Sequence, residues 1–169
     1  MANYDIFGAL EYYNDRANVI DSSTSKRAPV RQWQNFFQAP EAITVDTSVT
    51  GDYSYLAFDV DGFGSTEAGS ISNLRVSLAA TADIVDLTDA AMAATAEKLI
   101  IASLYIQTAG GDVISGSATL VSRYIGVINA ASLSDETVEW TVNPAINKLK
   151  AQIPSRKITS NILGRFEGQ

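Results

Sequence analysis

Two groups of aspartates have spacings that metal binding or proton transfer would need. Asp59 and Asp61 precede Gly62, as at the start of a calcium-binding loop. The EF-hand pattern also requires a glutamate at its twelfth position, where this sequence has Ser70. The favoured interpretation of this segment is therefore a turn between two strands.

Asp83, Asp86 and Asp89 lie three residues apart and would share one face of a helix. Three carboxylates there could bind a divalent cation. Alternatively, the first caps the helix and interacts with its N-terminal dipole, while the others face solvent. The second interpretation is favoured, because nothing in the sequence indicates the buried pocket that a catalytic carboxylate pair needs. We expect no metal site and no cofactor.

The chain also lacks the residue types and motifs on which most enzymes depend. It has 169 residues, with no cysteine and no histidine. This excludes disulfides, thiolate sites and thiol nucleophiles, and it removes the commonest general base and metal ligand. The sequence contains neither the dinucleotide-binding glycine pattern nor the G-x-S-x-G elbow. We expect no enzyme; catalysis by carboxylates alone, as in glycoside hydrolysis, is the remaining enzymatic alternative.

Composition and charge further restrict the class of protein. A hydrophobic fraction of 46% at this length predicts one folded domain with a core. No apolar run of about 18 residues and no signal-peptide pattern are present, so no membrane contact is expected. The net charge of −7 argues against nucleic acid as a partner.

The charge is unevenly distributed along the chain. Residues 41–139 hold fourteen acidic and three basic side chains, whereas residues 140–169 hold five basic side chains and one acidic side chain. An acidic body with a basic tail could dock on a second copy or on a similarly acidic neighbour. The alternative, of equal weight, is that the surface charge only maintains solubility.

The elements that would position these residues are mainly β-strands. From residue 42 onward, short β-prone segments alternate with turn residues, and Val138, Trp140 and Val142 would share one face of a strand. A helix is predicted over residues 83–98, with Thr81 or Asp83 as its cap. The predicted strands are residues 53–60, 74–78, 99–107, 119–131 and 137–143, with turns at 110–112 and 134–136. The predicted fold is mainly β, a small split barrel or sandwich with one inserted helix and extended N- and C-terminal arms.

The first 45 residues differ from this pattern. Apolar and aromatic side chains are loosely spaced, as on one helical face or along an extended arm, and a second aromatic cluster includes Trp33, Phe36 and Phe37. Such a segment either packs on the body or reaches a partner. We divide the chain into an N-terminal aromatic arm (1–45), a β-barrel hub domain (46–152) and a basic C-terminal arm (153–169).

Several segments together resemble a known family. Residues 117–128 are similar to a strand of that family that ends in a glycine. Residues 135–142, 144–156 and 164–166 are similar to the segments that follow this strand in the family, in the same order. Residues 72–78 and 99–106 fit the earlier strands. Over about residues 53–166, the chain resembles the hub domain of lambda-like minor tail proteins and its relatives in other phages and gene-transfer agents. The lambda-type protein also has a cysteine-rich, cluster-binding domain; because this chain has no cysteine, a metal cluster is not carried over.

The resemblance implies a structural protein in the tail of a bacteriophage virion, assembled in the host cytoplasm. A split-barrel hub domain would form a trimeric or hexameric ring at the tail tip or baseplate. Its partners would be further copies and other tail proteins: the tube, the distal tail or hub and spike proteins, and the tape measure. A small β-barrel module that binds a ligand or receptor through aromatic residues is the alternative. The candidate inter-subunit contacts are Trp33, Phe36, Phe37, Arg156, Lys157, Arg165 and Phe166.

Overall fold

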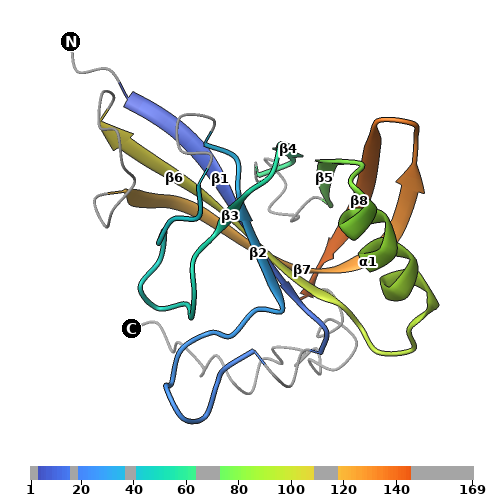
Figure 1. Ribbon diagram of the computed structural model, residues 1–169, viewed down its shortest axis with the longest axis horizontal. Coiled ribbons are helices and arrows are strands. Elements are labelled where there is room, and N and C mark those ends of the chain that lie inside the picture. Colours follow the sequence, from blue (N-terminus) through green and yellow to red (C-terminus); the bar gives the residue numbers. More distant parts are fainter. Residues whose placement is uncertain (1–3, 16–18, 37–40, 64–72, 109–117, 146–169) are drawn as a thin grey trace, which may run out of the picture.

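One curled β-sheet and one helix make up the described part of the protein (Figure 1). The computed structural model describes residues 4–15, 19–36, 41–63, 73–108 and 118–145. The sheet has eight strands in the order β3-β2-β1-β6-β7-β8-β5-β4 and curls into a half-barrel. The prediction of a mainly β, barrel-like domain with one helix is confirmed.

All neighbouring strands of the sheet are antiparallel except β2 and β3, which are parallel. The strands are β1 (Tyr4–Tyr13), β2 (Arg31–Gln34), β3 (Ser54–Tyr55), β4 (Phe58–Asp61), β5 (Leu74–Ala79), β6 (Leu99–Thr108), β7 (Thr119–Leu133) and β8 (Thr137–Pro144).

The two edges of the sheet belong to one short stretch of chain. β3 and β4 stand at opposite ends of the strand order, yet only Leu56 and Ala57 separate them in the sequence. The Leu56 amide donates to the Gln34 carbonyl of β2 (3.0 Å), and the Ala57 carbonyl accepts from the Ala79 amide of β5 (3.0 Å). Residues 54–61 therefore form a seam that links both ends of the sheet.

The C-terminal strands match the sequence pattern closely. β7 and β8 form a hairpin whose turn, residues 134–136, is closed by hydrogen bonds between Ser134 and Thr137. Val138, Trp140 and Val142 point into the core and are fully buried. The alternation predicted for this strand is confirmed, and Trp140 lies at the centre of the main hydrophobic cluster.

Helix α1 (Ala82–Ala93) covers this cluster from the β7 and β8 side (Figure 1). Thr81 is its cap, because its side chain accepts a hydrogen bond from the Ile84 amide. The helix ends five residues before the predicted boundary at 98. The Lys98 carbonyl accepts a hydrogen bond from the Ile128 amide of β7 (3.0 Å), so the backbone is already extended toward β6 there.

The N-terminal segment is part of the barrel. β1 pairs with β6 over its full length and with β2 over residues 9–12, so it is an interior strand of the sheet. From Phe7 to Tyr13 every residue is buried, because both faces of the strand are covered. The expectation of an N-terminal arm is therefore wrong for residues 4–13 and 31–34. Burial of both faces removes the alternation that would have identified the strand.

Candidate interaction surface

Three strands extend beyond the rest of the barrel. β2 pairs with β1 only at residues 9–12, and β8 pairs with β7 only from Gly126 onward. Residues 4–7 of β1, 104–108 of β6 and 119–125 of β7 therefore form a three-stranded extension, which we call the projection (Figure 1). The projection therefore lies at the N-terminal end of β1.

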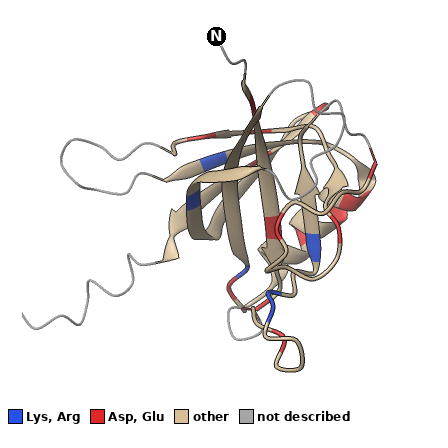
Figure 2. Cartoon of the chain, turned by 90° about the vertical axis from the view of Figure 1, so that its left-hand side faces the viewer, with Lys and Arg blue, Asp and Glu red and all other residues tan. Residues whose placement is uncertain are grey.

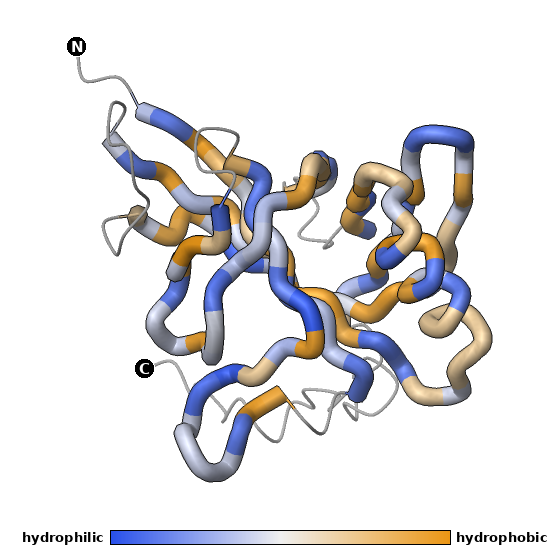
Figure 3. Tube along the Cα trace, in the orientation of Figure 1, coloured by the Kyte–Doolittle hydropathy of each residue, from blue (hydrophilic) through white to orange (hydrophobic). Residues whose placement is uncertain are grey.

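One face of the projection is apolar and open. Ile6, Ile106 and Thr119 are register partners across the three strands, so their side chains share this face. Gly8 and Leu104 form the next row, and deeper rows enter the main core. Figure 3 shows hydrophobic segments continuing along these strands. Tyr4 and Ile6 are 60% and 64% exposed on this face. Leu120 and Ile125, the register partners of Tyr105 and Ile101, are 41% and 46% exposed on the opposite face.

Few charges interrupt this surface. Figure 2 views the molecule from the side of the projection and shows its strands mainly without charged residues. Asp5 and Arg123 are the charged residues of the three segments that form the projection. Contiguous apolar surface of this kind is typical of protein–protein contact sites.

Residues 41–53 and Phe36 cover part of the opposite face of the projection. Phe7 stacks on Tyr105 with ring centroids 5.5 Å apart, and Phe36 packs on Phe7 at 5.6 Å. Ile43, Val45, Val49 and Tyr53 complete this second hydrophobic cluster. Within the described part of the chain, the projection is thus a strand layer covered mainly from one side.

A partly buried ionic network supports the base of the projection. Arg27 donates to both carboxylate oxygens of Glu11 (2.9 and 3.0 Å) and to Asp46 (2.7 Å). Arg123 of β7 donates to the same Asp46 oxygen (2.9 Å) and to Ser103 (3.1 Å). Two acidic and two basic side chains therefore connect β1 and β7 to the loop segments that contain Arg27 and Asp46.

The tyrosines around Glu11 complete its hydrogen bonding. Tyr13 and Tyr53 both donate their hydroxyls to the Glu11 carboxylate. Burial, reinforced by this carboxylate, raises the pKa of both hydroxyls, so they remain donors throughout the accessible pH range.

Opposing effects set the pKa values of Arg27 and Asp46. Burial alone would lower the pKa of Arg27, but hydrogen bonds and charge interactions with Glu11 and Asp46 outweigh it and raise that pKa. Burial alone would likewise raise the pKa of Asp46, but hydrogen bonds from Ser48 and Arg27 hold it well below its ordinary value. Both groups are charged at neutral pH, and the network is structural: every group has a protein partner.

The structure corrects two of the predicted contacts. Trp33 is only 5% exposed and lies 6.5 Å from Trp140 between ring centroids. Phe36 is 3% exposed in the second cluster. Neither side chain is available to a neighbour, because each fills core volume instead. Phe37, Arg156, Lys157, Arg165 and Phe166 lie outside the described residues.

The favoured roles of the two aspartate groups are only partly confirmed: Asp83, Asp86 and Asp89 are exposed on α1, but Thr81 and not Asp83 caps the helix. Asp59 and Asp61 are exposed within β4, so the prediction of a turn is wrong at these two positions. Gly62, the next residue, has a φ of +100°. Asp83, Asp86 and Asp89 face solvent on α1, where Asp83 pairs weakly with Arg31 at 3.5 Å. Among the described residues, no group of three or more potential ligands could hold a metal ion.

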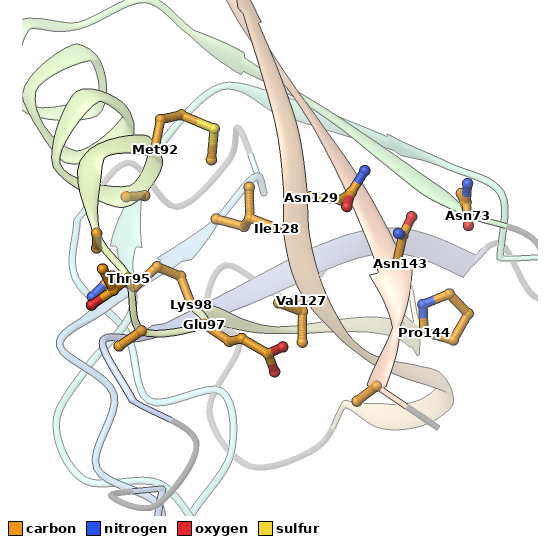
Figure 4. A pocket seen from close by; sticks show the side chains of 14 residues that line it. Asn73, Met92, Thr95, Glu97, Lys98, Val127, Ile128, Asn129, Asn143 and Pro144 are labelled. Atoms are coloured by element: carbon orange, nitrogen blue, oxygen red, sulfur yellow. The ribbon is translucent and has the colours of Figure 1, made fainter. Parts of the chain in front are cut away.

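A pocket of about 350 Å³ lies between the C-terminal end of α1 and strands β7 and β8 (Figure 4). Figure 4 shows the amides of Asn73, Asn129 and Asn143 on its strand side. Asn143 Oδ1 is buried and has no hydrogen-bond partner. The ammonium of Lys98 donates to the Asn14 carbonyl (3.0 Å). The pocket thus offers side-chain amides for hydrogen bonding. Ala145, the last described residue of the chain, is part of its lining.

The sequence interpretation missed the exposed residues of the projection. Ile6 was assigned to the N-terminal arm, and Val121 was assigned to the predicted strand 119–131 without any sign that it is exposed. Alternation of Tyr4 and Ile6 with Asp5 is the only signal that could have indicated a strand with an open face.

No family model, no curated protein and no solved structure matches this chain. Within the described ranges, no helix is long and apolar enough to cross a membrane.

Proposed function

We propose that this protein is a structural virion protein of a tailed bacteriophage, a ring-forming adaptor at the distal tail or baseplate. It would join the tail tube to the central hub or spike, and its partners would be further copies and other tail proteins. The proposal rests first on the resemblance of residues 53–166 to the hub domain of lambda-like minor tail proteins.

The structural observation that supports it most is the open face of the projection. Tyr4 is 60% and Ile6 64% exposed on a strand that is otherwise built into the sheet. A folded monomer gains nothing from leaving such side chains in water, whereas a ring subunit would bury them against its neighbours. The half-barrel below the projection would then supply the rigid body of each subunit.

The alternative of an aromatic ligand-binding module finds less support. Most aromatic residues considered for such a platform are buried, among them Tyr53, Tyr105, Tyr124 and Trp140. Tyr53 and Tyr124 also use their hydroxyls inside the protein. We therefore keep the adaptor as the proposed function.

Light scattering after size-exclusion chromatography, together with electron microscopy of the purified chain, tests the proposal. We expect a closed ring of three or six copies, and we expect that antibodies against the chain label the distal end of the tail of the parent particle. A protein that stays monomeric at high concentration, and that is absent from purified particles, would refute the adaptor role.

A further inference from the structure

A polar groove lies beside the start of β2, between residues 50–52 and the first turn of α1. We call it the β2 groove. Its volume of about 550 Å³ falls within the range of small-molecule sites. The residues that line it all belong to the described ranges. Trp33 and Leu56 line it and are almost buried, whereas Tyr55 of β3 is 38% exposed. The groove thus has an apolar floor and one accessible aromatic ring.

One side-chain amide is available in the groove. Gln32 is the register partner of Glu11 on β1, and it is only partly buried. Gly51 lies beside it with a φ of +82°, and a Cβ at that position would be 3.2 Å from Gln32 Nε2. The glycine therefore leaves this amide uncovered on one side. A carboxamide both donates and accepts hydrogen bonds, so it can pair with hydroxyl groups in either direction.

The charged side chains of the groove do not saturate one another. Arg31 approaches both carboxylate oxygens of Asp83 at 3.5 Å, whereas charge-assisted hydrogen bonds are usually about 2.7–2.9 Å long. Asp52 is exposed and accepts a hydrogen bond from the Thr44 hydroxyl at one carboxylate oxygen. The groove therefore presents one guanidinium and two carboxylates that retain capacity for further hydrogen bonds.

These groups restrict the chemistry of a ligand. A phosphate or another anion would meet two carboxylates and a single guanidinium, so its binding would be unfavourable. The carboxylates do not form a metal site either, since the described residues contain no group of three or more potential ligands for a metal ion. Neutral hydroxyl groups can donate to Asp52 and Asp83 and accept from Arg31 at the same time. A ligand with several hydroxyls and an apolar face fits this groove best.

We propose that the β2 groove binds a neutral saccharide. The ring of Tyr55 would pack against the C–H face of one sugar, while Gln32, Asp52 and Arg31 would hydrogen-bond to its hydroxyls. This site goes beyond the adaptor role and does not depend on it, because the projection takes no part in it. A lysine-rich peptide is the competing occupant, but it would place like charge beside Arg31.

A saccharide array followed by calorimetry tests the proposal on the full-length chain. The array carries neutral mono- and oligosaccharides of glucose, galactose, mannose and N-acetylglucosamine, together with sialylated and sulfated members. We expect binding to at least one neutral saccharide. Isothermal titration calorimetry with the saccharide that binds best then gives a dissociation constant per copy, which does not depend on the state of assembly.

Two matched pairs of variants locate the site. Tyr55→Ala should weaken binding about tenfold, because it removes the aromatic surface. Tyr4→Ala is its control, since Tyr4 is exposed on the projection and should leave the dissociation constant unchanged. Asp52→Ala, compared with Asp86→Ala on α1, provides a second pair in case Tyr55→Ala disturbs β3. Circular dichroism checks that every variant is folded.

Failure of every neutral saccharide to bind would overturn the proposal. Binding limited to sialylated or sulfated members would do the same, because it contradicts the charge of the groove, and so would equal losses in Tyr55→Ala and Tyr4→Ala. Binding of a lysine-rich peptide but of no saccharide, lost in Asp52→Ala, would assign the groove to a protein partner instead. None of these results bears on the adaptor role, which light scattering tests separately.

Discussion

Glu11 brings a carboxylate into the interior at the middle of β1, where it is 1% exposed and bound by Arg27, Tyr13 and Tyr53. Glu11→Gln keeps the size of the side chain but leaves the Arg27 charge without its main partner. Breaking one side of a buried ion pair typically costs about 3–5 kcal/mol. We expect a loss of that order in the free energy of unfolding, measured by urea denaturation.

Glu136→Gln in the exposed hairpin turn is the matched control and should change stability by less than about 0.5 kcal/mol. Equal effects of the two substitutions would show that the network does not stabilise the fold.

Asp46 makes stability depend on pH. Its pKa is held below the ordinary value of 3.8 in the folded protein. As the pH falls toward about 4, the unfolded chain takes up a proton at this position before the folded chain does, so unfolding becomes more favourable. The stabilisation is thus complete above the unfolded pKa and is lost progressively as the pH falls below it.

We expect Asp46→Asn to flatten the dependence of the unfolding free energy between pH 5 and pH 3 in urea titrations. Asp86→Asn on the exposed face of α1 should leave the slope as in the unmodified chain. A slope that Asp46→Asn does not alter would assign the acid sensitivity to other carboxylates.

At the scale of elements, Gly126 allows β7 and β8 to approach. A Cβ at this position would lie 2.5 Å from the Asn143 carbonyl oxygen, a backbone atom that cannot move aside. In Gly8, the nearest atom to such a Cβ is the Phe58 ring at 2.9 Å, a side chain that can turn. We expect Gly126→Ala to cost about 3 kcal/mol and Gly8→Ala clearly less, because overpacking is severe only where the neighbour is fixed.

Thermal unfolding followed by circular dichroism compares the two alanine variants directly. The opposite order of melting temperatures would contradict this account of the β7–β8 contact.

Helix α1 is joined to the sheet by a polar link as well as by apolar packing. Trp140 donates its indole N–H to the Thr88 hydroxyl (2.9 Å), which in turn donates to the Ile84 carbonyl (2.7 Å). Thr88→Val preserves the shape of the side chain but leaves the indole N–H buried without an acceptor, at a cost of about 1–3 kcal/mol.

The Trp140 fluorescence of the Thr88→Val variant should also change, because its N–H loses its partner. Thr88→Ser retains the hydroxyl and is expected to keep the native spectrum. An unchanged spectrum in the valine variant would mean that the indole finds another acceptor.

The same elements show how far the sequence can predict the fold. Strands β5 and β8 have one buried face and one more exposed face. Apolar and polar residues therefore alternate along their sequences, and their predicted positions were correct. β1 is buried on both faces from Phe7 onward, so it lacked a period and was taken for an arm. The candidate surface was harder still, because Ile6 and Val121 resemble ordinary core residues until the sheet places them beyond β2 and β8.

For the whole molecule, the exposed face of the projection should control assembly. Ile6→Lys puts a charge on that face without touching the core, since Ile6 is 64% exposed. If neighbouring copies bury this side chain, assembly should require about tenfold higher protein concentration in light scattering. Ile20→Lys, at an exposed position outside the sheet's named strands, is the control and should assemble normally.

The seam at residues 54–61 also bears on how the barrel opens. Its two halves hold opposite ends of the sheet, but the link between them is only Leu56 and Ala57, which can span about 7 Å when extended. When thermal motion breaks the hydrogen bonds of β3 or of β4, the freed end therefore stays within a few ångströms of its partner. Reclosure is then an intramolecular step at very high effective concentration. The sheet can therefore open locally at this seam while the rest of the fold stays intact. We expect amide exchange in β3 and β4 to proceed through brief local openings rather than through global unfolding.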